Sequence, residues 1–205
     1  MTILPTLPLI CIAVLACGQN QARPRSEELR GPRIEPAMPK PAFVLQQPDG
    51  TPFDFAQETR GKLTFLFFGY TNCPDVCPLH MANLAWAIGE LPEQERSSVR
   101  VVFVTTDPAR DTPDRLRAWL DRFDSSFVAL TGSAEALAQA QRMLGMPPAR
   151  REGSLVSANY GVSHGAQLWA FTPDDSAHVV YPFGMKREDL AADLAKLARV
   201  WPASP

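Results

Sequence analysis

Cys73 and Cys77 stand four residues apart in the segment FGYTNCPDVCP. This spacing is close to one helical turn, so the two thiols can converge on one point. Pro78 cannot donate a backbone hydrogen bond and therefore fits best in the first turn of a helix. Both sulfurs would then lie at or just before a helix N-terminus, where the partial positive charge favours the thiolate. The thiolate is the form that binds a metal or attacks a disulfide.

Several chemistries are open to this pair of thiols. A disulfide between them would close a small loop, and such a loop constrains little of the unfolded chain. Two soft sulfur donors favour Cu(I), zinc or a redox role. A structural zinc site takes four ligands, and only the three histidines could complete such a set. The C-x-x-x-C spacing also differs from the C-x-x-C of thioredoxin-like redox motifs.

The three histidines differ in their surroundings. His80 lies beside Met81, which belongs to the apolar stripe of the same predicted helix, so we expect His80 on the polar, solvated face. His178 begins an apparent strand after a polar turn and is expected at the surface. His164 lies in a loop just before another strand, and its position alone assigns it no role.

The elements around the cysteines predict a parallel βαβ unit. Residues 63–68 form a continuous apolar run that is typical of a buried strand. A helix with apolar residues at helical spacing follows the cysteines, and residues 99–104 predict a second buried strand. The cysteines therefore lie at the carboxyl end of a parallel strand, where open α/β sheets bind ligands.

Further elements complete an α/β domain with helices on both faces of one sheet. They are a hairpin around 48–50, a helix from 112–113, a strand at 127–130, a helix between Ser133 and Gly145, an antiparallel pair at 167–171 and 178–181, and a last helix that buries residues 190, 194, 197 and 201.

The N-terminal part of the chain predicts export and anchoring. Residues 1–17 carry no charge and hold an apolar run that is shorter than the roughly 20 residues of a membrane span, but suits a signal peptide. Its ending, VLAC, resembles a bacterial lipobox, so we expect lipidation at Cys17, with ordinary cleavage or an uncleaved anchor as alternatives. The polar, proline-rich residues 18–41 predict a semi-rigid linker, and residues 42–205 the globular domain.

Composition excludes one class of partner. The chain has 20 basic and 22 acidic residues and a net charge of −2, which is not the basic footprint of a nucleic-acid binder.

Three motifs, in the right order, resemble the Sco/SenC family over about residues 43–200. They are FGYTNCPDVCP at 68–78, TDPARDTP at 106–113, and Tyr160 with Val162 and His164. The resemblance implies a thioredoxin-like fold with a central mixed sheet, in a membrane-anchored domain on the periplasmic side of the cell envelope. It also implies copper, as Cu(I) or Cu(II), bound by Cys73, Cys77 and His164.

The resemblance further implies a role in assembling the CuA centre of cytochrome c oxidase. Family members deliver copper to that centre or reduce its cysteines, so the implied partners are the oxidase subunit that carries CuA and an upstream copper donor. The implied function is that of a metallochaperone rather than an enzyme, with a thiol-disulfide reductase as the alternative and a copper sensor as a third hypothesis.

Two positions depart from the family pattern, and one matches it. Asp75, between the cysteines, fits the motif and is expected to act next to the ligands rather than as one of them. Ser163 stands where the family often has aspartate, and Asn72 where histidine is common. A carboxylate before the histidine could orient or charge-balance the imidazole, so its absence bears on affinity and redox tuning.

Overall fold

The computed structural model describes residues 29–153 and 160–200. The predicted signal peptide, Cys17 and the first part of the predicted linker lie outside these described residues, as does the end of the chain after residue 200.

A six-stranded mixed sheet with the order β1-β10-β9-β4-β5-β6 runs through the centre of the domain. Strands β4, β5 and β6 are parallel to one another, whereas the remaining neighbours are antiparallel. This sheet confirms the predicted α/β class and the parallel βαβ unit. Its strands are β1 (Arg33–Pro39), β4 (Leu63–Gly69), β5 (Val99–Thr105), β6 (Val128–Leu130), β9 (Leu168–Phe171) and β10 (Ser176–Tyr181).

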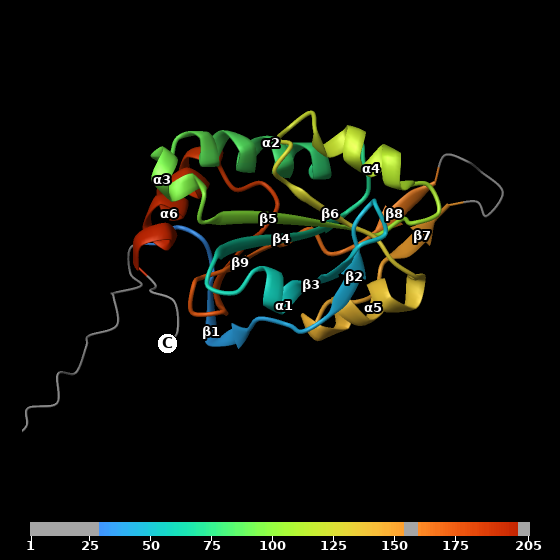
Figure 1. The fold of residues 1–205 in the computed structure, drawn as a ribbon, viewed down its shortest axis with the longest axis horizontal. Helices are drawn as coiled ribbons and strands as arrows, with labels where there is room; N and C mark the ends of the chain where they lie inside the picture. The colour runs from blue at the N-terminus through green and yellow to red at the C-terminus, as the bar shows by residue number, and fades with distance from the viewer. Residues whose placement is uncertain (1–28, 154–159, 201–205) are drawn as a thin grey trace, which may run out of the picture.

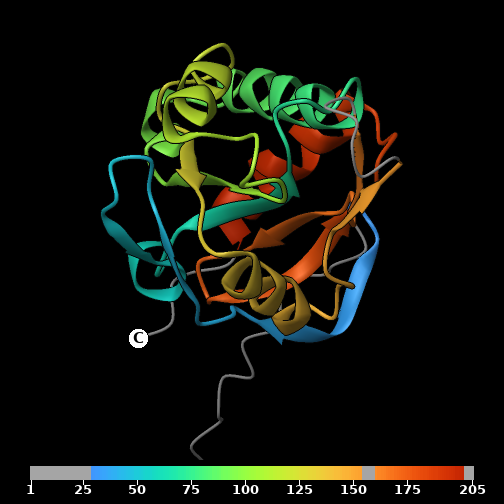
Figure 2. The ribbon, with the colours of Figure 1, turned by 90° about the vertical axis from the view of Figure 1, so that its right-hand side faces the viewer.

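Helices cover both faces of the sheet, as Figures 1 and 2 show. One face carries α2 (Val76–Gly89), α3 (Glu93–Arg96), α4 (Pro113–Leu120) and α6 (Arg187–Val200), and the other carries α1 (Phe55–Glu58) and α5 (Ala134–Met143). Two small sheets flank this core: β2 (Val44–Gln46) pairs with β3 (Pro52–Asp54), and β7 (Arg150–Glu152) pairs with β8 (Gly161–Ser163).

The alternation of side chains along β4 explains the two layers. Successive residues of a strand point to opposite faces. Leu63, Phe65 and Phe67 pack in the cluster that includes α2, α4 and α6. Leu66 and Phe68 pack in the cluster that includes α1 and α5. Because both faces are covered, the strand is a continuous apolar run rather than an alternating one.

The prediction that residues 18–41 form a linker was wrong for their last part. Residues 33–39 form β1, the edge strand of the main sheet, antiparallel to β10. Prolines make such a strand hard to recognise from the sequence. An edge strand tolerates them because one side of its backbone needs no hydrogen-bond partner from another strand. The sheet therefore begins before the predicted boundary at residue 42, and a chain cut there would lose β1.

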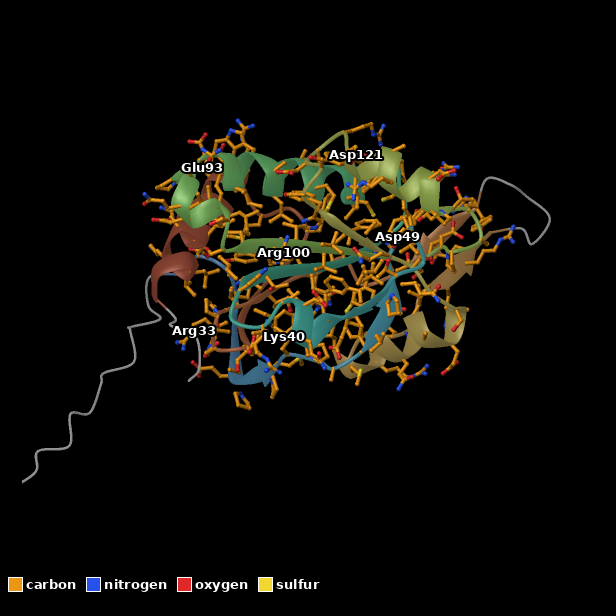
Figure 3. The ribbon with its side chains drawn as sticks, in the orientation of Figure 1. Arg33, Lys40, Asp49, Glu93, Arg100 and Asp121 are labelled. Carbon is orange, nitrogen blue, oxygen red and sulfur yellow. The ribbon has the colours of Figure 1, made fainter. Side chains whose placement is uncertain are left out.

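Buried charges hold both ends of β1 in place. Before the strand, the backbone N–H groups of Arg30 and Gly31 donate to the Asp193 carboxylate on α6. After it, the side chain of Lys40 is 2% exposed and pairs with Asp175 at 2.6 Å. Figure 3 shows Arg33 and Lys40 near the two ends of the strand. Residues 30–40 are thus an integral part of the domain.

No helix within residues 29–153 and 160–200 combines the length and apolar character needed to cross a membrane.

Candidate metal centre

The cysteine segment lies at the carboxyl end of β4, as predicted. The strand ends at Gly69, whose carbonyl accepts from the backbone N–H of Thr106 after the neighbouring strand β5. A turn follows in which the Cys73 N–H donates to the Tyr70 carbonyl. Helix α2 then begins at Val76. The two cysteines therefore lie where the parallel strands β4 and β5 end.

Cys73 lies against the N-terminus of α2. Its side chain is half-buried, and its Sγ accepts from the backbone N–H of Cys77 at 3.4 Å. A hydrogen bond from the Cys77 thiol, helped by backbone N–H groups at the start of the helix, lowers the pKa of Cys73 to about 5. Cys73 is therefore a thiolate at neutral pH, ready to bind a soft metal ion or attack a disulfide.

Cys77 is fully buried in the first turn of α2. The hydrogen bond that its thiol donates to Cys73, together with burial, raises the pKa of Cys77 above the ordinary cysteine value. No disulfide joins Cys73 and Cys77. The pair thus shares one proton, on the buried sulfur.

His164 faces the same thiol from the far side of the loop. Its Nε2 lies 3.8 Å from the Sγ of Cys77. Its Nδ1 lies 2.9 Å from the carbonyl oxygen of Gly165, which can only accept, so Nδ1 carries the proton. The rings of Phe67 and Tyr70 stand edge-on to the imidazole. The lone pair of Nε2 is therefore the one directed at the cysteines.

The side chains of Cys73, Cys77 and His164 suit copper in chemical type, although they are not already arranged as a complete metal site. Metal–sulfur and metal–nitrogen bonds of about 2.3 and 2.0 Å place two donors of one ion roughly 3.5–3.7 Å apart, close to the 3.8 Å between Cys77 and His164. Within residues 29–153 and 160–200, no group of three such side chains is already arranged to hold a metal ion. Cys73 would have to complete the set, which its position beside Cys77 permits.

A buried carboxylate positions the cysteine segment. Asp111 is 1% exposed and accepts from the backbone N–H of Thr71 at 3.1 Å and from the Thr71 hydroxyl at 2.5 Å. It also accepts from the Thr105 hydroxyl at 2.7 Å. Burial raises the pKa of Asp111. The loop between β5 and α4 thus fixes the residue that stands two positions before Cys73.

The same loop also holds the histidine segment. The Tyr160 hydroxyl donates to Asp107 at 2.8 Å, and Nη1 of Arg110 donates to the Tyr160 carbonyl at 3.0 Å. The guanidinium of Arg110 lies 3.5 Å from the centre of the Tyr160 ring and forms an ion pair with Asp107. The loop between β5 and α4 therefore contacts both the segment that carries the cysteines and the segment that carries His164.

The residues that depart from or match the family motif have local roles. Asp75 is exposed and caps α2, accepting from the Val76 N–H at 2.6 Å. The side chain of Asn72 accepts from Arg115. Ser163 is exposed at the end of β8, opposite Arg150 on β7.

The expectation for His80 was wrong. His80 is 7% exposed, and its Nε2 lies 3.1 Å from the carbonyl oxygen of Ala166. Burial lowers its pKa to about 4. The apolar stripe of α2 is wider than the spacing of its methionine and leucines suggested, because α6 packs against the helix as well. His178, expected at the surface, is partly buried and bonds Asp174 at 2.8 Å.

Sequence reasoning did not assign roles to Asp107, Asp111 and Tyr160. The first two lie inside the TDPARDTP motif, so a signal was present. Their roles depend on the fold, which brings this loop into contact with Thr71 on the cysteine segment and with Tyr160 on the histidine segment.

Comparison with known proteins places this site in a family. A family model described as SCO1/SenC matches residues 32–199. A protein of Stutzerimonas stutzeri that is named as copper-binding is 36% identical over 174 residues, which cover 83% of this chain and 81% of that protein.

Solved structures agree with this match. Apo Sco1 from Thermus thermophilus is 31% identical, with a TM-score of 0.74 over 82% of this chain and 96% of that one. ScoI from Arabidopsis thaliana, solved with copper bound, is 27% identical, with a TM-score of 0.71 over 79% of this chain and 99% of that one. The thioredoxin-like α/β fold expected from the sequence is confirmed by these similarities.

Proposed function

The chain belongs to the SCO1/SenC family, and from that premise we propose that it binds one copper ion through Cys73, Cys77 and His164 and delivers it to the CuA centre of cytochrome c oxidase. Relatives are named as copper-binding or contain copper, and the Sco family is one of cytochrome c oxidase assembly proteins. The implied partners are the oxidase subunit that carries CuA and a protein that supplies the copper.

One observation carries this proposal. The Nε2 of His164 faces the Sγ of Cys77 at 3.8 Å, although the two residues are 87 positions apart in the chain. The Nδ1 hydrogen bond that fixes this tautomer is the arrangement usual for histidines that bind metals. Beside it stands a cysteine that is a thiolate at neutral pH.

The donor set suits transfer rather than permanent storage. Two sulfur donors satisfy Cu(I), and an imidazole adds the nitrogen donor that Cu(II) prefers. Three protein donors leave room for an incoming thiolate of the recipient. Because Cys73 is half-buried rather than enclosed, such a thiolate could reach the metal from its side.

The test is a transfer experiment. The full chain is loaded with Cu(I) and mixed with a reduced, metal-free CuA domain, and the copper on each protein is measured after separation. We expect most of the copper to move to the CuA domain within minutes, since that site offers more donors. Copper that stays on the loaded chain would point to a sensor or store and contradict delivery.

His164 should matter more for Cu(II) than for Cu(I). We expect His164→Ala to lower Cu(II) affinity by about 100-fold, or about 2.8 kcal/mol, and Cu(I) affinity much less, because two thiolates can hold Cu(I) alone. The measurement is competition with a chelator for each oxidation state. His178→Ala, a histidine that bonds Asp174 away from the thiols, is the matched control. Equal losses for both oxidation states would remove His164 from the donor set.

A thiol-disulfide reductase remains the second candidate, favoured by one observation. An accessible Cys73 thiolate stands next to a buried Cys77 that retains its proton. In such a reaction Cys73 attacks a target disulfide, Cys77 then loses its proton and displaces the target, and the target leaves as two thiols while this chain becomes oxidised. An oxidised CuA domain in the transfer experiment would reveal this activity as newly formed target thiols.

We also propose that Cys17 carries a lipid that anchors the chain on the periplasmic side of the envelope. The support is the apolar leader and the VLAC ending. The wild-type chain should take up a labelled fatty acid and sediment with membranes, whereas Cys17→Ser should lose the label. Unlabelled wild-type chain in the soluble fraction would exclude the lipid while leaving the copper proposal intact.

A further inference from the structure

Two histidines of the described chain bond two consecutive backbone carbonyls of one short segment. His164 Nδ1 lies 2.9 Å from the oxygen of Gly165, and His80 Nε2 lies 3.1 Å from the oxygen of Ala166. A carbonyl oxygen can only accept, so the ring nitrogen donates in both bonds. The first bond is local to the segment. The second comes from α2, the helix that carries Cys77.

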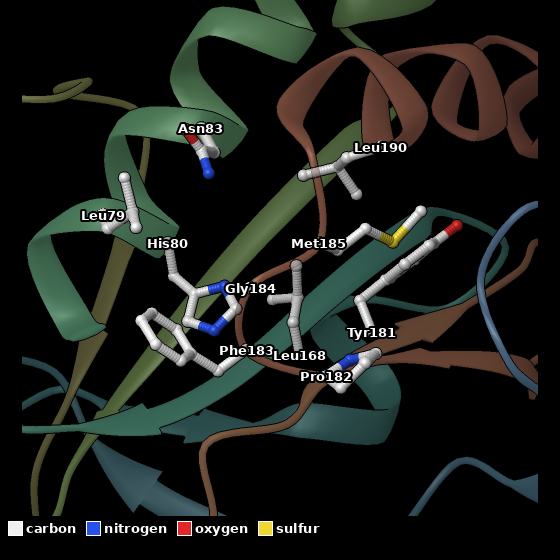
Figure 4. Close-up of a pocket in the computed structure, with 10 residues that line it drawn as sticks. All are labelled: Leu79, His80, Asn83, Leu168, Tyr181, Pro182, Phe183, Gly184, Met185 and Leu190. Atoms are coloured by element: carbon white, nitrogen blue, oxygen red, sulfur yellow. The ribbon is translucent and has the colours of Figure 1, made fainter.

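Aromatic and aliphatic side chains hold the His80 ring in this position. The ring of Phe67, on β4, lies 4.8 Å away between centroids, and the ring of Phe183 lies 5.9 Å away. Figure 4 shows the imidazole beside Phe183, with Leu168 next to it. With only 7% of the residue exposed, the ring has little freedom to turn toward water.

The segment that His80 bonds needs such a support. Residues 164–167 connect β8 to β9, and β8 belongs to a separate two-stranded sheet with β7 rather than to the main sheet. The ladder of the main sheet therefore secures the chain only from Leu168 onward. In the part of the chain that the structure describes, Cys77 and His80 are the α2 side chains that reach this segment, Cys77 by a 3.8 Å contact with His164 and His80 by a hydrogen bond.

Cys77 and His80 are three residues apart on α2, so their side chains leave the same face of the helix. Each reaches the histidine segment, one at the ring of His164 and the other two residues further along the chain. The two contacts therefore connect α2 to residues 164–167 at two separate points. Loss of the His80 hydrogen bond would leave the contact between Cys77 and His164 as the remaining side-chain contact from α2 to residues 164–167 in the described part of the chain.

We propose that His80 is a positioning residue that ties α2 to the His164 segment and thereby fixes the separation of the Cys77 and His164 donors. His80 is not a ligand in this proposal, since its Nε2 is occupied by the Ala166 carbonyl. The consequence for copper rests on the proposed function. The consequence for the position of His164 does not, and it can be measured without metal.

Two variants of the full chain separate the hydrogen bond from the bulk of the ring. His80→Leu fills the space without a donor, whereas His80→Gln places an amide N–H at about the reach of Nε2. In the leucine variant we expect Cu(II) affinity to fall about tenfold, the sulfur-to-Cu(II) absorption to shift, and Cu(I) affinity to stay within about twofold. The glutamine variant should restore most of the parental Cu(II) behaviour. His178→Leu should leave both affinities unchanged.

The metal-free proteins supply the independent readout. In nitrogen-15 NMR spectra, the His164 ring signals should move in His80→Leu and return toward their parental positions in His80→Gln. If the parental chain bound no copper, the proposed function would fail, and these spectra would still decide the role of His80. Unmoved His164 signals in the leucine variant would overturn the proposal. So would equal losses of Cu(II) affinity in both variants, which would make the His80 ring a ligand.

Discussion

Replacing Cys77 with serine is expected to abolish tight Cu(I) binding. In the proposed site the buried sulfur of Cys77 contacts both Cys73 and His164, so its loss leaves one thiolate and one imidazole that no longer share a partner. A hydroxyl is a hard donor and does not replace a thiolate for Cu(I). We expect affinity to fall at least a thousandfold, or about 4 kcal/mol, as measured by competition with a Cu(I) chelator.

Cys73→Ser should give a loss of the same order, because it removes the other thiolate. Cys17→Ser is the matched control, since it makes the same exchange at a cysteine outside the proposed site. The expected order is therefore parental affinity in the control and severe loss in both site variants. A Cys77→Ser chain that kept parental Cu(I) affinity would rule out the proposed centre.

Truncating Asp111 should destabilise the fold and disturb the site together. Asp111→Ala leaves the buried N–H of Thr71 without its acceptor and removes the partner of two hydroxyls. A buried donor without a partner costs roughly 1–3 kcal/mol. We expect the free energy of unfolding to fall by about 3 kcal/mol, which corresponds to a decrease in Tm of about 10 °C. Thermal unfolding of the metal-free chain measures it.

Two further variants sharpen this test. Asp121→Ala removes an aspartate at the end of α4 (Figure 3). Its ion pair with Arg117 is partly exposed, and such pairs contribute at most about 1 kcal/mol. Asp111→Asn keeps one acceptor and should fall between the parent and the alanine variant. If Asp111→Ala unfolded at the same temperature as Asp121→Ala, the carboxylate would not be what holds Thr71.

Much of this centre could be predicted from the sequence because its signals are local. The apolar run at 63–68, the two cysteines and Pro78 lie within one short stretch, and together they placed the thiols at the carboxyl end of a strand. The structure confirms that placement. His164 was different, since its part in the site came from the family resemblance and not from its own surroundings.

What the sequence did not reveal depends on contacts between distant segments. Nothing near His80 indicates that α6 would pack on α2 or that the Ala166 carbonyl would lie within its reach. The strand at 33–39 was missed because its polar and proline-rich residues fit a linker as well as a sheet edge. Pairing with β10, far along the chain, is what makes it a strand.

The position of β1 limits how far a lipid on Cys17 would let the domain stand from a membrane. If the lipid is on Cys17, only residues 18–29 separate it from Arg30 and Gly31, whose backbone N–H groups are already bonded to Asp193. Even fully stretched, those dozen residues span only about 40 Å, whereas a free segment through residue 41 would span about twice that. With a lipid on Cys17, the domain would therefore be confined to a thin layer next to the bilayer, and a recipient site would have to lie within that layer.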